Sequence, residues 1–227
     1  MKPSDLNRAE ILSYLRTPEL DAELDGKLTV CIEELCRAAV PRTVWRLLPV
    51  QHSPEGVRLG GLLLGGKDIA LHLEGCRQAV LFAATLSSPV DALIRRAEVS
   101  DMTKAVMLGA VAGAAIESVC SQLELFLHRE LGAKYYTERF SAGYGDFPLS
   151  QQADLIALLD ASRKIGLTVT QHQTLVPMKS VTAVFGLSDR PVNDARRYCC
   201  GKSCTECPNR DGCLFAGAKA AEKERIQ

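Results

Sequence analysis

The sequence predicts an α+β fold, and three observations support this. Apolar residues recur at helical spacing over residues 4–38 and again over residues 101–131. Short runs with strand-forming residues lie between and after these stretches, bounded by glycine and proline. Helices and strands do not alternate regularly along the chain. Such an order favours α+β over a doubly wound parallel sheet.

The N-terminal part predicts two helices. The first covers residues 4–16, with Ser4 as a suitable N-cap. The second covers residues 18–38, and Pro41 ends it because proline cannot continue a helix. We expect this helical segment, residues 1–40, to pack on the main part of the chain.

The next part predicts strands with a short helix between them. Residues 42–51 form a strand, and Pro49 places that strand at an edge of the sheet because proline has no N–H for a second ladder. Further along we expect a turn at 65–66, a helix at 68–73, a buried strand at 77–86, helices at 89–100 and 101–131, a strand at 133–140, a helix at 150–166, and strands at 167–171 and 180–186.

Composition excludes some functions. The 227 residues carry 27 basic and 27 acidic side chains, so the chain has no general attraction to nucleic acid or anionic lipid. The start of the chain is polar, and the most apolar stretch, residues 105–116, is shorter than the roughly 20 residues of a membrane span. We therefore expect a cytoplasmic protein with neither nucleic acid nor membrane as a partner.

One motif, "RFSAGYGDFP" at residues 139–148, combines groups that bind small molecules. Arg139 can pair with a carboxylate through two hydrogen bonds. Gly143 permits a ligand to approach the backbone closely, and Tyr144 can stack or donate a hydrogen bond. Taken alone, the same letters also fit a tight turn with a surface arginine.

This motif is followed by "LIALLDASRKIGLTVTQ" and "VPMKSVTAVFG", and is preceded by "LFLHREL". The succession over residues 117–186 resembles the activation domain of cobalamin-dependent methionine synthase, in a free-standing form. The resemblance implies a C-shaped α+β fold around a twisted antiparallel sheet, which binds S-adenosylmethionine. It also implies docking on the cobalamin-binding modules of a methionine synthase, with a flavodoxin-type electron donor. In such a system S-adenosylmethionine methylates the reduced corrin and restores methylcobalamin.

The resemblance also implies roles for particular residues. Arg139 matches the arginine that holds the ligand, and Ser141 matches a small residue whose backbone contacts it. Gly143 and Tyr144 match the family's Gly-Tyr pair. Together these residues form the core of the predicted S-adenosylmethionine site.

Two further positions and one departure complete this comparison. Glu117 is the candidate for a helix carboxylate near the ligand's amine or sulfonium. Phe185 falls where the family can present a tyrosine, so a hydroxyl contact is missing there. The family's Thr-Glu-Ser reads here as Thr170, Gln171 and His172, which removes a carboxylate that serves either the ligand or the corrin partner.

The C-terminal segment concentrates five of the nine cysteines, which the resemblance does not explain: Cys199, Cys200, Cys204, Cys207 and Cys213. Four thiolates at such spacings can hold a [4Fe–4S] cluster or Zn²⁺, and free or redox-active thiols are the remaining alternative. A cluster could relay an electron to the corrin, whereas a structural metal would only order the tail. The other four cysteines lie in apolar surroundings, and we expect buried thiols there.

These observations define the expected organisation and function. We expect a helical segment at 1–40, an α+β core at 41–190 and a Cys-rich tail at 191–227. The expected function is binding of S-adenosylmethionine in support of reductive methylation, or reactivation, of the cob(II)alamin form of a methionine synthase or related corrinoid methyltransferase. The alternative is an iron–sulfur or zinc protein that transfers electrons or acts as a scaffold, keeping the fold without that ligand. A stand-alone methyltransferase is disfavoured because no Gly-rich loop follows a first strand.

Overall fold

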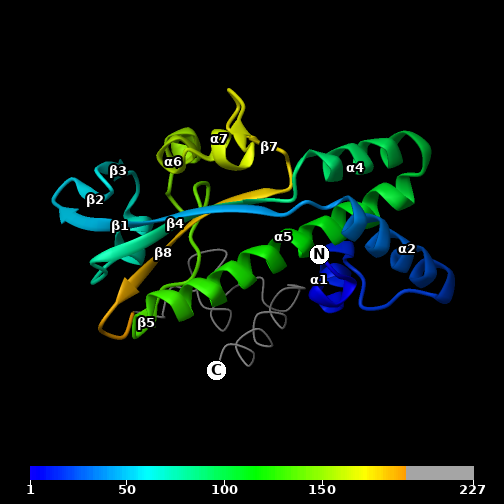
Figure 1. Ribbon diagram of the computed structural model, residues 1–227, viewed down its shortest axis with the longest axis horizontal. Helices are drawn as coiled ribbons and strands as arrows, with labels where there is room; N and C mark the ends of the chain where they lie inside the picture. The colour runs from blue at the N-terminus through cyan, green and yellow to red at the C-terminus, as the bar shows by residue number, and fades with distance from the viewer. Residues whose placement is uncertain (193–227) are drawn as a thin grey trace.

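The computed structural model describes residues 1–192, and Figure 1 shows them as an antiparallel sheet covered by helices on both faces. The six strands of the sheet are in the order β3-β2-β1-β4-β8-β5, and β6 and β7 form a separate hairpin. The prediction of an α+β fold is thus confirmed. The strands are β1 (Arg42–Ser53), β2 (Gly56–Leu59), β3 (Leu62–Leu64), β4 (Gln78–Thr85), β5 (Tyr135–Tyr136), β6 (Thr168–Val169), β7 (Leu175–Val176) and β8 (Ser180–Ser188).

The helices divide between the two faces of the sheet (Figure 1). One face carries α1 (Arg8–Leu15), α2 (Ala22–Ala38), α4 (Ser88–Ser100) and the long α5 (Met102–Leu131). The other carries α3 (Lys67–His72), α6 (Gln152–Leu159) and α7 (Ala161–Ile165). Two short 3₁₀ turns, η1 (Pro3–Asp5) and η2 (Leu149–Gln151), precede α1 and α6.

The central strand β4 contributes side chains to two separate hydrophobic cores, because successive side chains point to opposite faces of the sheet. Phe82 belongs to the core under α5, whereas Leu81 belongs to the core under α6 and α7. Within residues 1–192, α5 is long and apolar enough to cross a membrane by length and composition, but 61% of its most apolar window is buried in the protein. Its position at the centre of the first core accounts for that apolar character.

Both N-terminal helices begin four residues later than expected. In each, the residue just before the observed start acts as the N-cap. Asn7, rather than Ser4, accepts a hydrogen bond from the N–H of Ala9 and opens α1. Asp21 accepts one from the N–H of Leu24 and opens α2. Each cap satisfies an N–H that has no partner inside the helix.

The single helix expected at 150–166 is two helices. Asp160 separates α6 from α7 in a left-handed conformation, with φ of 56°, which aspartate tolerates better than most residues. Its carboxylate accepts a hydrogen bond of 2.8 Å from Nε of Arg163, which holds the break in place. The amphipathic pattern continues through the break, so periodicity alone could not show it.

Pro49 does not put β1 at the edge of the sheet, because β1 lies between β2 and β4. The proline instead marks the point where β1 changes partner. Residues up to Pro49 pair with β4, and residues from Val50 onward pair with β2. The missing N–H therefore removes no hydrogen bond that either ladder needs.

Gly186 on β8 gives a test of how tightly the sheet and the α3 segment pack. A Cβ at this position would lie 2.4 Å from Sγ of Cys76, so the neighbour would have to move. We expect Gly186→Ala to lower the free energy of unfolding by about 1–3 kcal/mol, as overpacking does. Chemical denaturation would measure it. Adding Cys76→Ala should recover most of the loss, and simple additivity of the two changes would contradict this packing.

Candidate functional site

The arginine of the predicted motif lies just beyond β5, on the edge of the sheet beside β8. Thr137 donates its N–H to the carbonyl of Gly186, and Phe140 and Val184 then form an isolated bridge. Three steps on this segment thus match two steps on β8, which is the geometry of a bulge. The strand expected at 133–140 is shortened to two residues for this reason, and the bulge contains Arg139.

Arg139 is held between two carboxylates of α5. Its Nη2 lies 3.2 Å from Oε2 of Glu117, and its Nε lies 3.4 Å from Oε1 of Glu124. The two glutamates are seven residues apart, so they lie on one face of the helix, two turns from each other. Only 21% of the Arg139 side chain is exposed, which makes these ion pairs less screened than surface pairs.

Cys120 lies on the same face of α5, between the two glutamates. Burial raises the pKa of its thiol to about 12, and the nearby Arg139 offsets this only in part. The thiol is therefore protonated at neutral pH, and it cannot serve as a nucleophile there. The chemistry available to this group of residues is binding and orientation.

The turn that follows Arg139 presents an exposed aromatic ring. The N–H of Tyr144 donates to the carbonyl of Ser141, and the N–H of Gly143 donates to the carbonyl of Phe147. Gly143 has a φ of 94°, a conformation that favours glycine. The side chain of Tyr144 is 54% exposed, which leaves its ring open to a ligand.

Asp146 fastens this turn to the first turn of α3. Its two carboxylate oxygens accept hydrogen bonds from the N–H groups of Lys67 and Asp68, at 2.8 and 2.9 Å. In return, Oδ2 of Asp68 accepts the N–H of Asp146 at 3.1 Å. The hydrogen bonds from Asp68 and Lys67 hold the pKa of Asp146 below its ordinary value.

We expect Asp146→Ala to release the turn and to lower the free energy of unfolding, as the loss of a helix cap does. Hydrogen exchange of residues 141–147 would measure the release. Because the folded-state pKa is depressed, the stabilisation is complete above the ordinary value of 3.8 and is lost as the pH falls through the folded-state pKa. Unchanged exchange in the variant would show that the turn does not depend on this carboxylate.

A second tyrosine, Tyr14 on α1, lies near Glu117 and was not indicated by the sequence. The ring of Tyr14 lies 3.2 Å from the point where a Cβ on Gly113 would be, so the glycine makes room for it. Burial, and then the negative charges of Glu117 and Glu10, raise the pKa of Tyr14. Tyr144 makes the smallest contribution to this rise in the pKa of Tyr14.

We name the group of Arg139, Glu117, Glu124, Tyr14 and Tyr144 the arginine cluster. Its charges are two carboxylates and one guanidinium, with aromatic rings beside them. Such a set suits a ligand that carries both a carboxylate and a cationic centre. The seven-residue spacing of the two glutamates could have indicated Glu124, whereas nothing in the sequence connects Tyr14 to a motif 125 residues away.

The other predicted positions lie elsewhere. Phe185 is fully buried, with its ring centroid 5.5 Å from that of His128 and 6.1 Å from that of Tyr136. In this conformation it supports the site through packing and offers no surface to a ligand. Gln171 and His172 lie exposed between β6 and β7, beside α7 and across the sheet from α5 (Figure 1). The departure at these two residues therefore lies on the hairpin of β6 and β7, not on the elements that carry Arg139 and Glu117.

The predicted metal ligands Cys199, Cys200, Cys204, Cys207 and Cys213 lie outside the described residues. Within residues 1–192, no group of three or more histidine, cysteine or acidic side chains is arranged to hold a metal ion. The remaining cysteines are free and buried, as expected from their apolar surroundings: Cys31, Cys36, Cys76 and Cys120.

The fold and the cluster together describe a helix-covered antiparallel sheet with a charged and aromatic site between its edge and a long helix. No protein-family model and no curated protein sequence matches the chain. Among solved structures, the crystal structure of the MetH reactivation domain bound to AdoHcy matches with a TM-score of 0.57 and 18% sequence identity. The match covers 74% of this chain and 66% of that one, just under two thirds of its length. A likeness at this identity shows that the two proteins share a fold.

Proposed function

We propose that the chain binds S-adenosylmethionine at the arginine cluster and supports reductive methylation of the cob(II)alamin form of a methionine synthase or a related corrinoid methyltransferase. Two facts support this: the shared fold with a reactivation domain bound to AdoHcy, and the closeness of Arg139 to Glu117 in this chain. The second carries the proposal, since the resemblance to the activation domain names both Arg139 and Glu117 although they are 22 positions apart in the sequence.

The residues of the cluster have distinct parts in this proposal. Arg139 holds the ligand's carboxylate, and Glu117 offsets the charge of its amine or sulfonium. Tyr144 covers the adenosyl part, and the backbone from Ser141 to Gly145 faces its polar edge. The corrin of the partner supplies the nucleophile, and methyl transfer leaves the S–C electron pair on sulfur. The chain's own contribution is positioning of the methyl group and exclusion of water.

The partner and the location follow from the same proposal. We infer docking on cobalamin-binding modules in the cytoplasm, with the face that carries the arginine cluster turned to the corrin. The exposed Tyr144 supports this choice of face. A flavodoxin-type donor or a cluster in the Cys-rich tail would provide the electron, and anaerobic purification with an absorption spectrum and metal analysis would distinguish the two.

Binding of S-adenosylmethionine is the first property to test. Equilibrium dialysis of the full chain against methyl-labelled S-adenosylmethionine should give one saturable site. Unlabelled AdoHcy should compete for it. If the chain retains no label at millimolar ligand while it is folded, the proposal is wrong, and the electron-transfer or scaffold alternative is favoured.

A further inference from the structure

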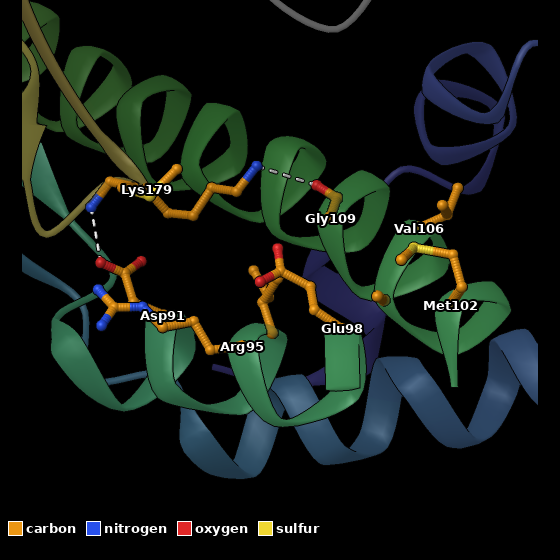
Figure 2. A pocket seen from close by; sticks show the side chains of 10 residues that line it. Asp91, Arg95, Glu98, Met102, Val106, Gly109 and Lys179 are labelled. Atoms are coloured by element: carbon orange, nitrogen blue, oxygen red, sulfur yellow. Dashed lines mark hydrogen bonds between the residues drawn. The ribbon is translucent and has the colours of Figure 1, made fainter. Parts of the chain in front are cut away.

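A cavity of about 460 Å³ lies between α4, α5 and the connection from β7 to β8 (Figure 2). Its α4 wall is formed by Asp91, Ile94, Arg95 and Glu98, which follow each other at helical spacing and so form one face. Its α5 wall is formed in the same manner by Met102, Ala105, Val106 and Gly109, and the connection adds Met178 and Lys179. Neither the motif nor the arginine cluster includes any of these residues.

The cavity has one mostly apolar side and two pairs of opposite charges. Met102, Val106 and Met178 form an exposed apolar surface around it. Lys179 and Arg95 supply positive charge, and Asp91 and Glu98 supply negative charge (Figure 2). A ligand that matches this lining carries both charges at one end and an apolar body at the other.

Asp91 is a buried carboxylate in this lining that has one unpartnered oxygen. It is only 7% exposed, and its Oδ2 accepts the N–H of Met178 at 2.8 Å. Its Oδ1 is buried and has no hydrogen-bond partner within residues 1–192, and this carboxylate forms part of the cavity lining (Figure 2). A buried acceptor without a donor is unfavourable, and an ammonium group in the cavity would satisfy it once the carboxylate turns toward the ligand.

Lys179 provides the opposite charge within reach of the same space. Its Nζ donates to the carbonyl of Gly109 at 3.1 Å, which uses one of its three donors. Burial lowers the pKa of Lys179, and the negative charge of Asp91 partly offsets this. A ligand carboxylate beside Nζ would compensate the buried charge.

Gly109 keeps the cavity open. Nothing lies within 4 Å of the point where its Cβ would be, so alanine would fit there. Glycine inside a helix is less stable than alanine by roughly 0.5–1 kcal/mol, and local packing gives no reason for it here. The absent side chain leaves space above the helix next to Lys179.

We propose that this cavity binds an apolar α-amino acid, with its ammonium group at Asp91 and Glu98, its carboxylate at Lys179 and Arg95, and its side chain against Met102, Val106 and Met178. The site is separate from the arginine cluster: Gly109 is two helical turns from Glu117, and Tyr14 covers Gly113 between them. The proposal does not depend on the proposed function.

Calorimetry on the full chain with L-leucine and L-methionine would test this site. We expect saturable binding of both amino acids. We also expect at least tenfold weaker binding of 4-methylpentanoate, which lacks the ammonium group, and of isopentylamine, which lacks the carboxylate. Equal binding of all four probes, or none by the amino acids, would overturn the proposal.

Variants test whether the amino acid binds in this cavity or elsewhere on the protein. Gly109→Leu should fill the space and abolish binding, whereas Gly109→Ala should leave it within about twofold and serve as the matched control. Asp91→Asn and Lys179→Met should each weaken binding at least tenfold, which keeps the test valid if Gly109→Leu fails to fold. Wild-type affinity in Gly109→Leu would contradict the site. Arg139→Ala should bind the amino acid normally, and loss of amino-acid binding in this variant would show that the two sites are one.

Discussion

Replacing Arg139 with alanine should weaken binding of S-adenosylmethionine by roughly 10–150-fold, which corresponds to about 1.5–3 kcal/mol for a hydrogen bond to a charged group. The side chain is mostly buried and lies within 3.4 Å of both glutamates of α5. Its removal takes away the group proposed to hold the ligand's carboxylate and leaves Glu117 and Glu124 without the guanidinium that balances them. Calorimetric titration of wild type and variant would measure the change.

Two further variants make this result specific. Arg139→Lys keeps the positive charge but loses the planar guanidinium that can donate two parallel hydrogen bonds. Its affinity for S-adenosylmethionine should therefore lie between those of wild type and Arg139→Ala. Arg163→Ala removes an arginine that also pairs with a carboxylate, Asp160, but is well exposed on α7, and it should bind normally. Equal affinity in wild type and folded Arg139→Ala would show that the ligand does not use this residue.

The second large effect is on stability. Phe185→Ala should lower the free energy of unfolding by about 3–5 kcal/mol, the usual cost of removing a buried aromatic ring. Phe185 is completely buried and packs against Phe82, His128 and Tyr136. Because β8 and α5 meet through this ring, its removal would leave an empty space between them. Urea denaturation followed by circular dichroism would measure it.

The matched control for this change is Phe126→Ala on α5, where the ring is 50% exposed. We expect a change within about 0.5 kcal/mol there, since surface substitutions away from special features have small effects. If the two phenylalanine variants were equally stable, Phe185 would not occupy the core position that the structure gives it.

The sequence predicts most elements of this fold because their signals are local. The long helix α5 carries its apolar pattern and ends at Gly132, and β4 and β8 are apolar runs with clear ends. The sequence does not show the break at Asp160, because the break depends on one backbone conformation. The prediction that Pro49 lies on an edge strand is wrong, because the position of β1 depends on which strands pair with it. Neither property is visible in residue spacing.

The candidate site was predictable only in part. The motif indicates Arg139, Gly143 and Tyr144, because arginine and glycine-flanked tyrosine have chemistry that a short stretch can show. Tyr14 could not be inferred, because its place depends on α1 crossing α5 at Gly113. The burial of Phe185 likewise depends on which face of β8 meets α5. Whether the named residues bind the ligand stays a prediction.

A crystal structure of the full chain grown with S-adenosylmethionine tests the central claim most directly. We expect the ligand between α5 and the turn at 141–147, with its carboxylate on Arg139, its sulfonium toward Glu117 and its adenosyl part against Tyr144. A ligand bound elsewhere, or no ligand at the arginine cluster in crystals grown at saturating concentration, would contradict the account.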